Sequence, residues 1–71
     1  MFLTYSRQSR AQSHALEAWR EAARVVSARW EMFLAAEGKA RRVAFASYLA
    51  ALDAEEAAAA DVSAVAYRAA I

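Results

Sequence analysis

The stretch Leu34-Ala35-Ala36-Glu37-Gly38-Lys39 contains the one glycine of the chain, almost at its middle. Glycine takes the left-handed backbone conformation that ends a helix, and no other residue type in this stretch adopts it as cheaply. Proline is absent, and alanine, the strongest helix former, supplies about a third of the 71 residues. The sequence therefore predicts a single all-α domain, an antiparallel hairpin with one helix over about residues 5–36, a turn at 37–39 and a second helix over about residues 40–70.

Two apolar faces run along the first predicted helix. One is a seam with alternating spacings of three and four, the a/d pattern of a helix that packs on a neighbour. The other is a stripe made mainly of alanine, offset from the seam by roughly 100–150°. The seam consists of Leu16, Trp19, Ala23, Val26, Trp30 and Phe33, and the stripe contains Ala11, Ala15, Ala18, Ala22 and Val25. Because one neighbouring helix covers only one face, we expect the second face to pack against a further helix.

Beyond the turn the apolar pattern resumes, with bulky residues first, carboxylates in the middle and small residues at the end. Folding the chain back at Gly38 aligns residues whose numbers sum to about 76, and this register predicts an aromatic cluster of Trp30, Phe33, Phe45 and Tyr48. If Trp30 is buried there, Trp30→Ala is expected to destabilise the fold by about 3–5 kcal/mol. The same register predicts charge pairs across the hairpin that contribute only about 0–1 kcal/mol each. These pairs are Arg20 with Glu56, Arg24 with Asp53 and His14 with Asp61.

The length of the chain limits the stability of a lone hairpin. Below roughly 70–80 residues a single core supplies about 3–5 kcal/mol, and small proteins add disulfides, a metal or further subunits. There is no cysteine, so disulfides are excluded. We therefore expect a homo-oligomer, in the first place a dimer of hairpins forming a four-helix bundle, that acts through protein–protein interaction. The residues expected to carry this interaction are Leu16, Trp19, Ala22, Val26, Trp30, Phe33, Phe45, Tyr48 and Leu52.

The charge of the chain does not indicate a class of partner, because nine basic and eight acidic residues are interspersed and leave a formal net charge of +1. Basic side chains nevertheless gather in the middle of the first helix and directly after the turn. The expected dimer of hairpins resembles the Rop-type RNA-binding modulators in its architecture. It shares no sequence motif with them. RNA or DNA binding is therefore the main alternative, although Glu17 and Glu21 among the arginines would repel phosphate. Its candidate residues are Arg20, Arg24, Lys39, Arg41 and Arg42.

No residue constellation indicates catalysis, so we expect neither enzymatic activity nor a cofactor. The serines are scattered without a glycine-rich elbow, and the single histidine has no oriented partner. A carboxylate metal site is a distant alternative. The order of the residues in His14-x-x-Glu17 is the reverse of the Glu-x-x-His found in ferritin-like sites. We therefore expect the charged residues to form a solvated helix face instead of a metal site. The candidate ligands are His14, Glu17, Glu21, Glu55, Glu56 and Asp61.

Hydropathy indicates a protein that does not enter a membrane. The longest strongly apolar run, residues 43–52, is about half of the ~20 residues that a membrane-spanning helix needs. The first residues lack the apolar region of a signal peptide, so we expect a cytoplasmic protein. Aromatic and apolar residues near the two chain ends would then offer a patch to a partner if they are exposed. These residues are Phe2, Leu3, Tyr5 and Tyr67.

Overall fold

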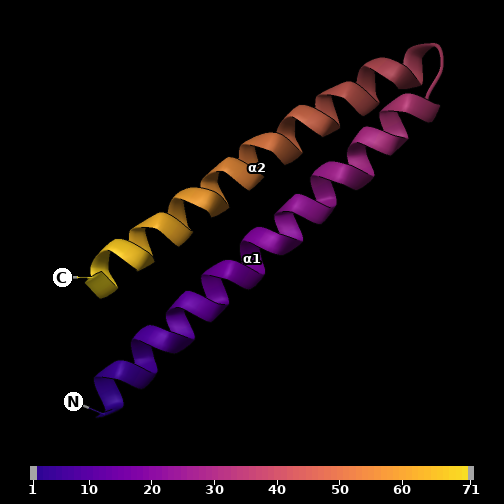
Figure 1. The fold of residues 1–71 in the computed structure, drawn as a ribbon. Coiled ribbons are helices and arrows are strands. Elements are labelled where there is room, and N and C mark those ends of the chain that lie inside the picture. Colours follow the sequence, from indigo (N-terminus) through magenta and orange to yellow (C-terminus); the bar gives the residue numbers. More distant parts are fainter. Residues whose placement is uncertain (1, 71) are drawn as a thin grey trace.

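The computed structural model describes the backbone of residues 2–70 and the side chains of residue 7 and residues 9–70. Two α-helices make up this part of the chain: α1 spans Phe2–Ala35 and α2 spans Lys39–Ala70. They lie side by side and run antiparallel, with the turn at one end and both chain ends at the other (Figure 1). The predicted all-α hairpin is therefore confirmed. Neither helix, as far as it is described, is long and apolar enough to cross a membrane.

The turn occupies residues 36–38, one position earlier than expected at its start. Gly38 has a φ of 57°, in the left-handed region that glycine adopts without steric penalty. The backbone N–H of Ala36 donates to the carbonyl oxygen of Phe33, and that of Arg41 donates to the carbonyl oxygen of Gly38, both at 3.2 Å. These two bonds close the last turn of α1 and the first turn of α2, so the chain reverses at the one glycine.

The hairpin is long and thin, with Cα extents of 58 × 14 × 11 Å. Two helices side by side enclose no interior, because a side chain at their contact has the other helix on one side only. Among the described residues only Ala15 and Ala51 are buried, at 8% and 7% exposure, and no side chain there is fully buried. The core is therefore a single line of contact between α1 and α2.

This line of contact falls between the two faces that the sequence pattern separates on the first helix. It includes the seam residues Trp19 and Val26, which are half-buried, and also Ala15 and Ala22 from the alanine stripe. The expectation that the stripe has a different neighbour from the seam is wrong for these two alanines. The small alanine side chains let the two backbones approach each other, and the larger seam residues pack along the edge of the contact. Other stripe residues, such as Ala18, are exposed.

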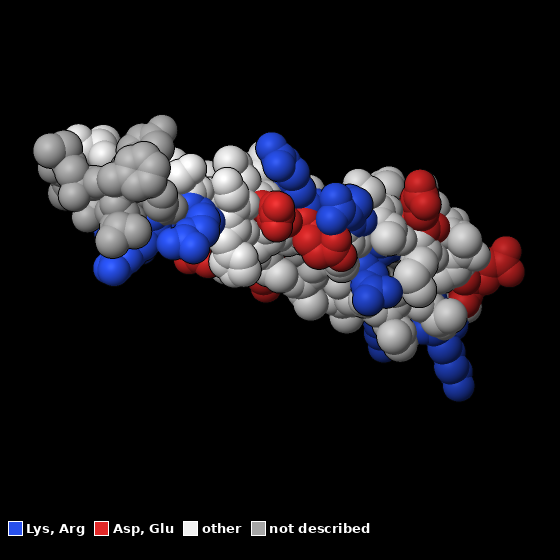
Figure 2. All heavy atoms as spheres, turned by 90° about the horizontal axis from the view of Figure 1, so that it is seen from below, with Lys and Arg blue, Asp and Glu red and all other residues white. Residues whose placement is uncertain are grey.

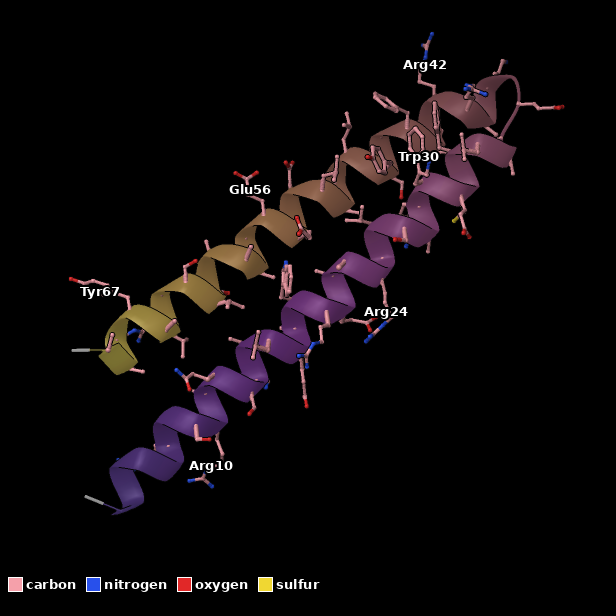
Figure 3. All side chains as sticks on the ribbon, viewed as in Figure 1. Arg10, Arg24, Trp30, Arg42, Glu56 and Tyr67 are labelled. Atoms are coloured by element: carbon pink, nitrogen blue, oxygen red, sulfur yellow. The ribbon has the colours of Figure 1, made fainter. Side chains whose placement is uncertain are left out.

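The charge pairs predicted across the hairpin do not form among the described residues. The ion pair found there lies within α1, where the Nε of Arg24 donates to Glu21 Oε2 at 3.0 Å. Arg24 points away from α2, and Glu56 points away from α1 (Figure 3). The fold-back register puts the expected partners at similar heights along the hairpin. Their side chains leave the two helices at angles that point to the outer sides of the hairpin, so they do not meet.

Candidate interaction surface

Four aromatic side chains, two from each helix, meet beside the turn. The ring centroids are 5.4 Å apart for Trp30 and Phe33, 5.0 Å for Trp30 and Tyr48, 5.3 Å for Phe33 and Phe45, and 6.3 Å for Phe45 and Tyr48. The ring planes are tilted against each other by 34° to 50°, away from the face-to-face sandwich that aromatic pairs disfavour. The cluster predicted from the fold-back register is therefore confirmed.

A cation covers one edge of this cluster. The guanidinium carbon of Arg41 lies 4.4 Å from the centroid of the Phe33 ring. At a partly exposed site such a cation–π contact contributes about 0.5–1 kcal/mol. Arg41, a candidate for nucleic-acid binding in the sequence, is thus engaged with the cluster in this structure.

The cluster is open on one side of the hairpin. Trp30 remains 41% exposed and Phe45 42% exposed. Leu34 and Leu49, each four residues after one of these aromatics and so one helical turn further on, are 57% and 45% exposed. At about 100° per residue, both pairs lie on the same side of the line of contact. We call the surface formed by Trp30, Leu34, Phe45 and Leu49 the aromatic face.

The opposite side of the hairpin is also apolar, but its residues are smaller. Near the turn it forms a shallow groove that includes the exposed side chains of Met32 and Val43. Near the chain ends a second groove is flanked by Arg7 and Arg68. We call this surface the alanine face. Its described groove residues are Met32, Ala36, Ala40, Val43, Ala44 and Ser47 near the turn, and Arg7, Ala11, Val65, Arg68 and Ala69 near the ends.

One polar contact joins the helices halfway along the hairpin. The indole Nε1–H of Trp19 donates to Glu55 Oε1 at 3.0 Å, and it is the one side-chain hydrogen bond between α1 and α2 in the described part of the chain. A part-buried indole N–H needs an acceptor, and a carboxylate is a strong one. From the sequence, Glu55 is a candidate metal ligand among the carboxylates in the middle of the second helix, not a partner of Trp19. The fold-back register could have predicted this contact, because it places the indole of Trp19 at the height of the carboxylate of Glu55.

No protein-family model, curated protein or solved structure matches this chain. Its function is therefore inferred from the surface of the hairpin itself.

The residues predicted to carry self-association divide into two groups. Seven of the nine are half-buried in the contact between α1 and α2, namely Leu16, Trp19, Ala22, Val26, Phe33, Tyr48 and Leu52. Trp30 and Phe45 are exposed, and so are Leu34 and Leu49, which the prediction missed. The hairpin therefore uses most of the predicted seam internally and leaves the aromatic face exposed.

The five basic residues considered for nucleic-acid binding do not form one patch on this hairpin. Arg24 lies in the middle of α1, roughly 17 Å from the end of the helix at Ala35 at 1.5 Å per residue. Arg24 and Arg42 point to opposite sides of the hairpin (Figure 3). On the face seen in Figure 2, acidic side chains lie among the basic ones in the middle of the molecule. Arg20 lies one turn before Arg24, while Lys39 and Arg41 follow the turn.

The remaining candidates are the carboxylates and histidine considered for a metal site and the aromatic and apolar residues at the chain ends. Within the described part of the chain, no three His, Asp or Glu side chains are placed to share a metal ion. At the open end of the hairpin Tyr67 is exposed. The side chains of Phe2, Leu3 and Tyr5 lie outside the described residues.

Proposed function

We propose that this protein is a non-enzymatic interaction module that works as a homo-oligomer, first of all a dimer of hairpins forming a four-helix bundle. The observation that supports the proposal is the exposure of the largest apolar side chains near the contact line, with Trp30, Phe45 and Leu49 between 41% and 45% exposed. A pair of helices covers such side chains from one direction only. A second pair supplies the missing layer.

The energetics of the hairpin favour the same conclusion. Burial of apolar surface contributes about 25 cal/mol per Å², and contiguous exposed apolar patches on small proteins mark interaction sites. A standard interface takes about 800 Å² from each partner, roughly a seventh of the 5701 Å² accessible surface of this hairpin. Self-association would thus add to the small stability of a core in which, among the described residues, Ala15 and Ala51 alone are buried.

The dimer leaves further surface for another protein. If the aromatic face is covered by a second hairpin, the alanine face and the exposed Tyr67 stay accessible. A helix from a partner would approach most closely at Ala36, Ala40 and Ala44 of the alanine face, because these side chains are short. This surface supports an adaptor, structural or regulatory role for the assembled bundle.

The test is the molar mass in solution, measured by light scattering over a concentration series at low and moderate salt. We expect a species of twice the 7.8 kDa mass of one chain, with helical circular dichroism throughout. Trp30→Ala/Leu49→Ala is expected to shift the equilibrium toward monomer, whereas Tyr67→Ala serves as an apolar control outside the aromatic face. A wild-type chain that is folded and monomeric at every concentration would contradict the proposal.

A further inference from the structure

The outer edge of α2 carries a stripe at a/d spacing whose members face away from α1, apart from Leu52, which is half-buried against it. Its members follow each other at intervals of three, four, three and four residues: Arg42, Phe45, Leu49, Leu52 and Glu56. Phe45 and Leu49 are exposed, as are Arg42 and Glu56. Arg42 and Glu56 point to the same side of α2, away from α1 (Figure 3). This outer stripe therefore has an apolar centre and opposite charges at its two ends.

The two charges of the outer stripe are arranged evenly about Leu49. Arg42 lies seven residues before Leu49 and Glu56 lies seven residues after it, so each charge is about two helical turns from the centre. If two copies of α2 pack antiparallel with a two-fold axis at Leu49, each Arg42 lies beside Glu56 of the other copy. Parallel packing would instead set Arg42 against Arg42 and Glu56 against Glu56.

We propose that two copies of the chain dimerise through the outer stripe, antiparallel and centred on Leu49. This inference rests on the proposed self-association and names its surface and orientation. A two-fold axis requires that each residue meets its counterpart reciprocally. Arg42 and Glu56 satisfy this requirement and Leu49 meets its own copy, while Phe45 lies beside Asp53 and Leu52 beside Ala46 of the other copy. The ion pair of the described hairpin involves neither Arg42 nor Glu56, so both charges are available to a second copy.

The first helix fits the same axis. The contacts of Trp30 with Tyr48 and of Trp19 with Glu55 set the heights of the two helices, and they place Ser27 of α1 level with Leu49 of α2. An antiparallel second copy then brings its Trp30 against the region before Ser27. That region is a shallow hollow lined by Trp19, Arg20, Ala23, Arg24 and Ser27. Ala23 and Ser27, the two small side chains of the hollow, leave room there for the exposed indole.

Disulfide cross-linking tests the orientation, because the chain has no cysteine and each introduced thiol is unique. A disulfide needs Cα atoms about 4.4–6.8 Å apart. We expect Leu49→Cys to form a covalent dimer on oxidation and Arg42→Cys alone not to do so, since the two copies of position 42 would lie about 21 Å apart along the helices. A mixture of Arg42→Cys and Glu56→Cys chains is expected to cross-link to each other.

The same experiment identifies the other possible arrangements. Self-cross-linking of Arg42→Cys together with Leu49→Cys would show parallel packing and overturn the proposed orientation. Efficient cross-linking of Val43→Cys without that of Leu49→Cys would place the second copy on the alanine face and overturn the proposed surface. A wild-type chain that stays monomeric would overturn the proposed function itself, so the two failures are distinguishable.

Charge reversal provides an independent measurement of the same contact. Arg42→Glu breaks two pairs per dimer and is expected to raise the dimer Kd, measured by sedimentation equilibrium, by roughly 3–30-fold. Arg42→Glu/Glu56→Arg is expected to restore it to within about twofold. Lys39→Glu makes a matched charge change one turn away and off the outer stripe, so it is expected to leave the Kd unchanged. An equal effect of Arg42→Glu and Lys39→Glu would overturn the proposal.

Discussion

Trp19 and Glu55 form a polar contact inside an otherwise apolar interface, at 3.0 Å and part-buried. We expect Glu55→Ala to lower the free energy of unfolding by about 1–2 kcal/mol, because a hydrogen bond to a charged acceptor is lost and the indole N–H is left without it. Glu55→Gln keeps an acceptor and is expected to lose less. Urea unfolding monitored by circular dichroism measures both changes.

A double-mutant cycle separates this hydrogen bond from general packing. In the Glu55→Ala background, the loss caused by Trp19→Phe is expected to be about 1 kcal/mol smaller than in the wild type, since the bond is already absent. Strictly additive losses would show that the contact does not stabilise the hairpin.

Trp30 belongs to the aromatic cluster, but 41% of its surface remains exposed. Its removal therefore costs less than the 3–5 kcal/mol of a buried tryptophan, and we expect Trp30→Ala to destabilise the hairpin by about 2–3 kcal/mol at low protein concentration. The loss is expected to grow at concentrations where a second copy covers the indole. Chemical unfolding at two concentrations measures the difference, with Tyr67→Ala as an exposed control expected to stay within about 0.5 kcal/mol. An unchanged unfolding curve would contradict the packing seen in the cluster.

At the scale of the two helices, Gly38 decides whether the chain folds back. Its φ of 57° strains any residue with a Cβ, yet apart from the adjacent residues of the chain no atom lies within 4 Å of the position that a Cβ would take. Gly38→Ala therefore introduces about 1–2 kcal/mol of backbone strain in the turn and no clash. In a continuous helix, alanine at position 38 is more favourable than glycine by about 1 kcal/mol.

Gly38→Ala is accordingly expected to shift the chain toward an opened, continuous helix that exchanges its halves with another copy. Such a helix of 71 residues would be about 107 Å long, and its radius of gyration would clearly exceed the 16.4 Å of the hairpin. Small-angle X-ray scattering measures this change. Gly38→Asn is the control, because asparagine tolerates the left-handed conformation better than alanine. A compact Gly38→Ala chain of unchanged radius would contradict the expected opening.

At the scale of the whole molecule, stability is expected to depend on protein concentration. A hairpin with two buried alanines gains most of its additional burial from a second copy, so association and folding are linked. For a dimer of this size we expect the Tm to rise by about 3–6 °C for each tenfold increase in concentration. Differential scanning calorimetry over two decades of concentration measures the shift. A Tm independent of concentration would indicate that the folded hairpin stands alone.

The architecture follows from local features of the sequence. Alanine-rich composition without proline specifies helix, and the single glycine near the middle specifies where the chain reverses. The reversal then sets the register, which brings Trp30 and Phe33 to Phe45 and Tyr48 whatever the details of packing. These properties depend on backbone preference and on distance along the chain, so the sequence by itself determines them.

The tertiary structure decided which side of each helix is covered. The seam and the alanine stripe on α1 are close enough in angle that the contact line falls between them, including Ala15 and Ala22 and leaving Trp30 partly exposed. The same rotation turns Arg24 and Glu56 outward, and it places Glu55 beside the indole of Trp19. A wheel position specifies only the angle at which a side chain leaves its helix. Which angles meet depends on how closely the two backbones approach, and packing across the interface settles that distance.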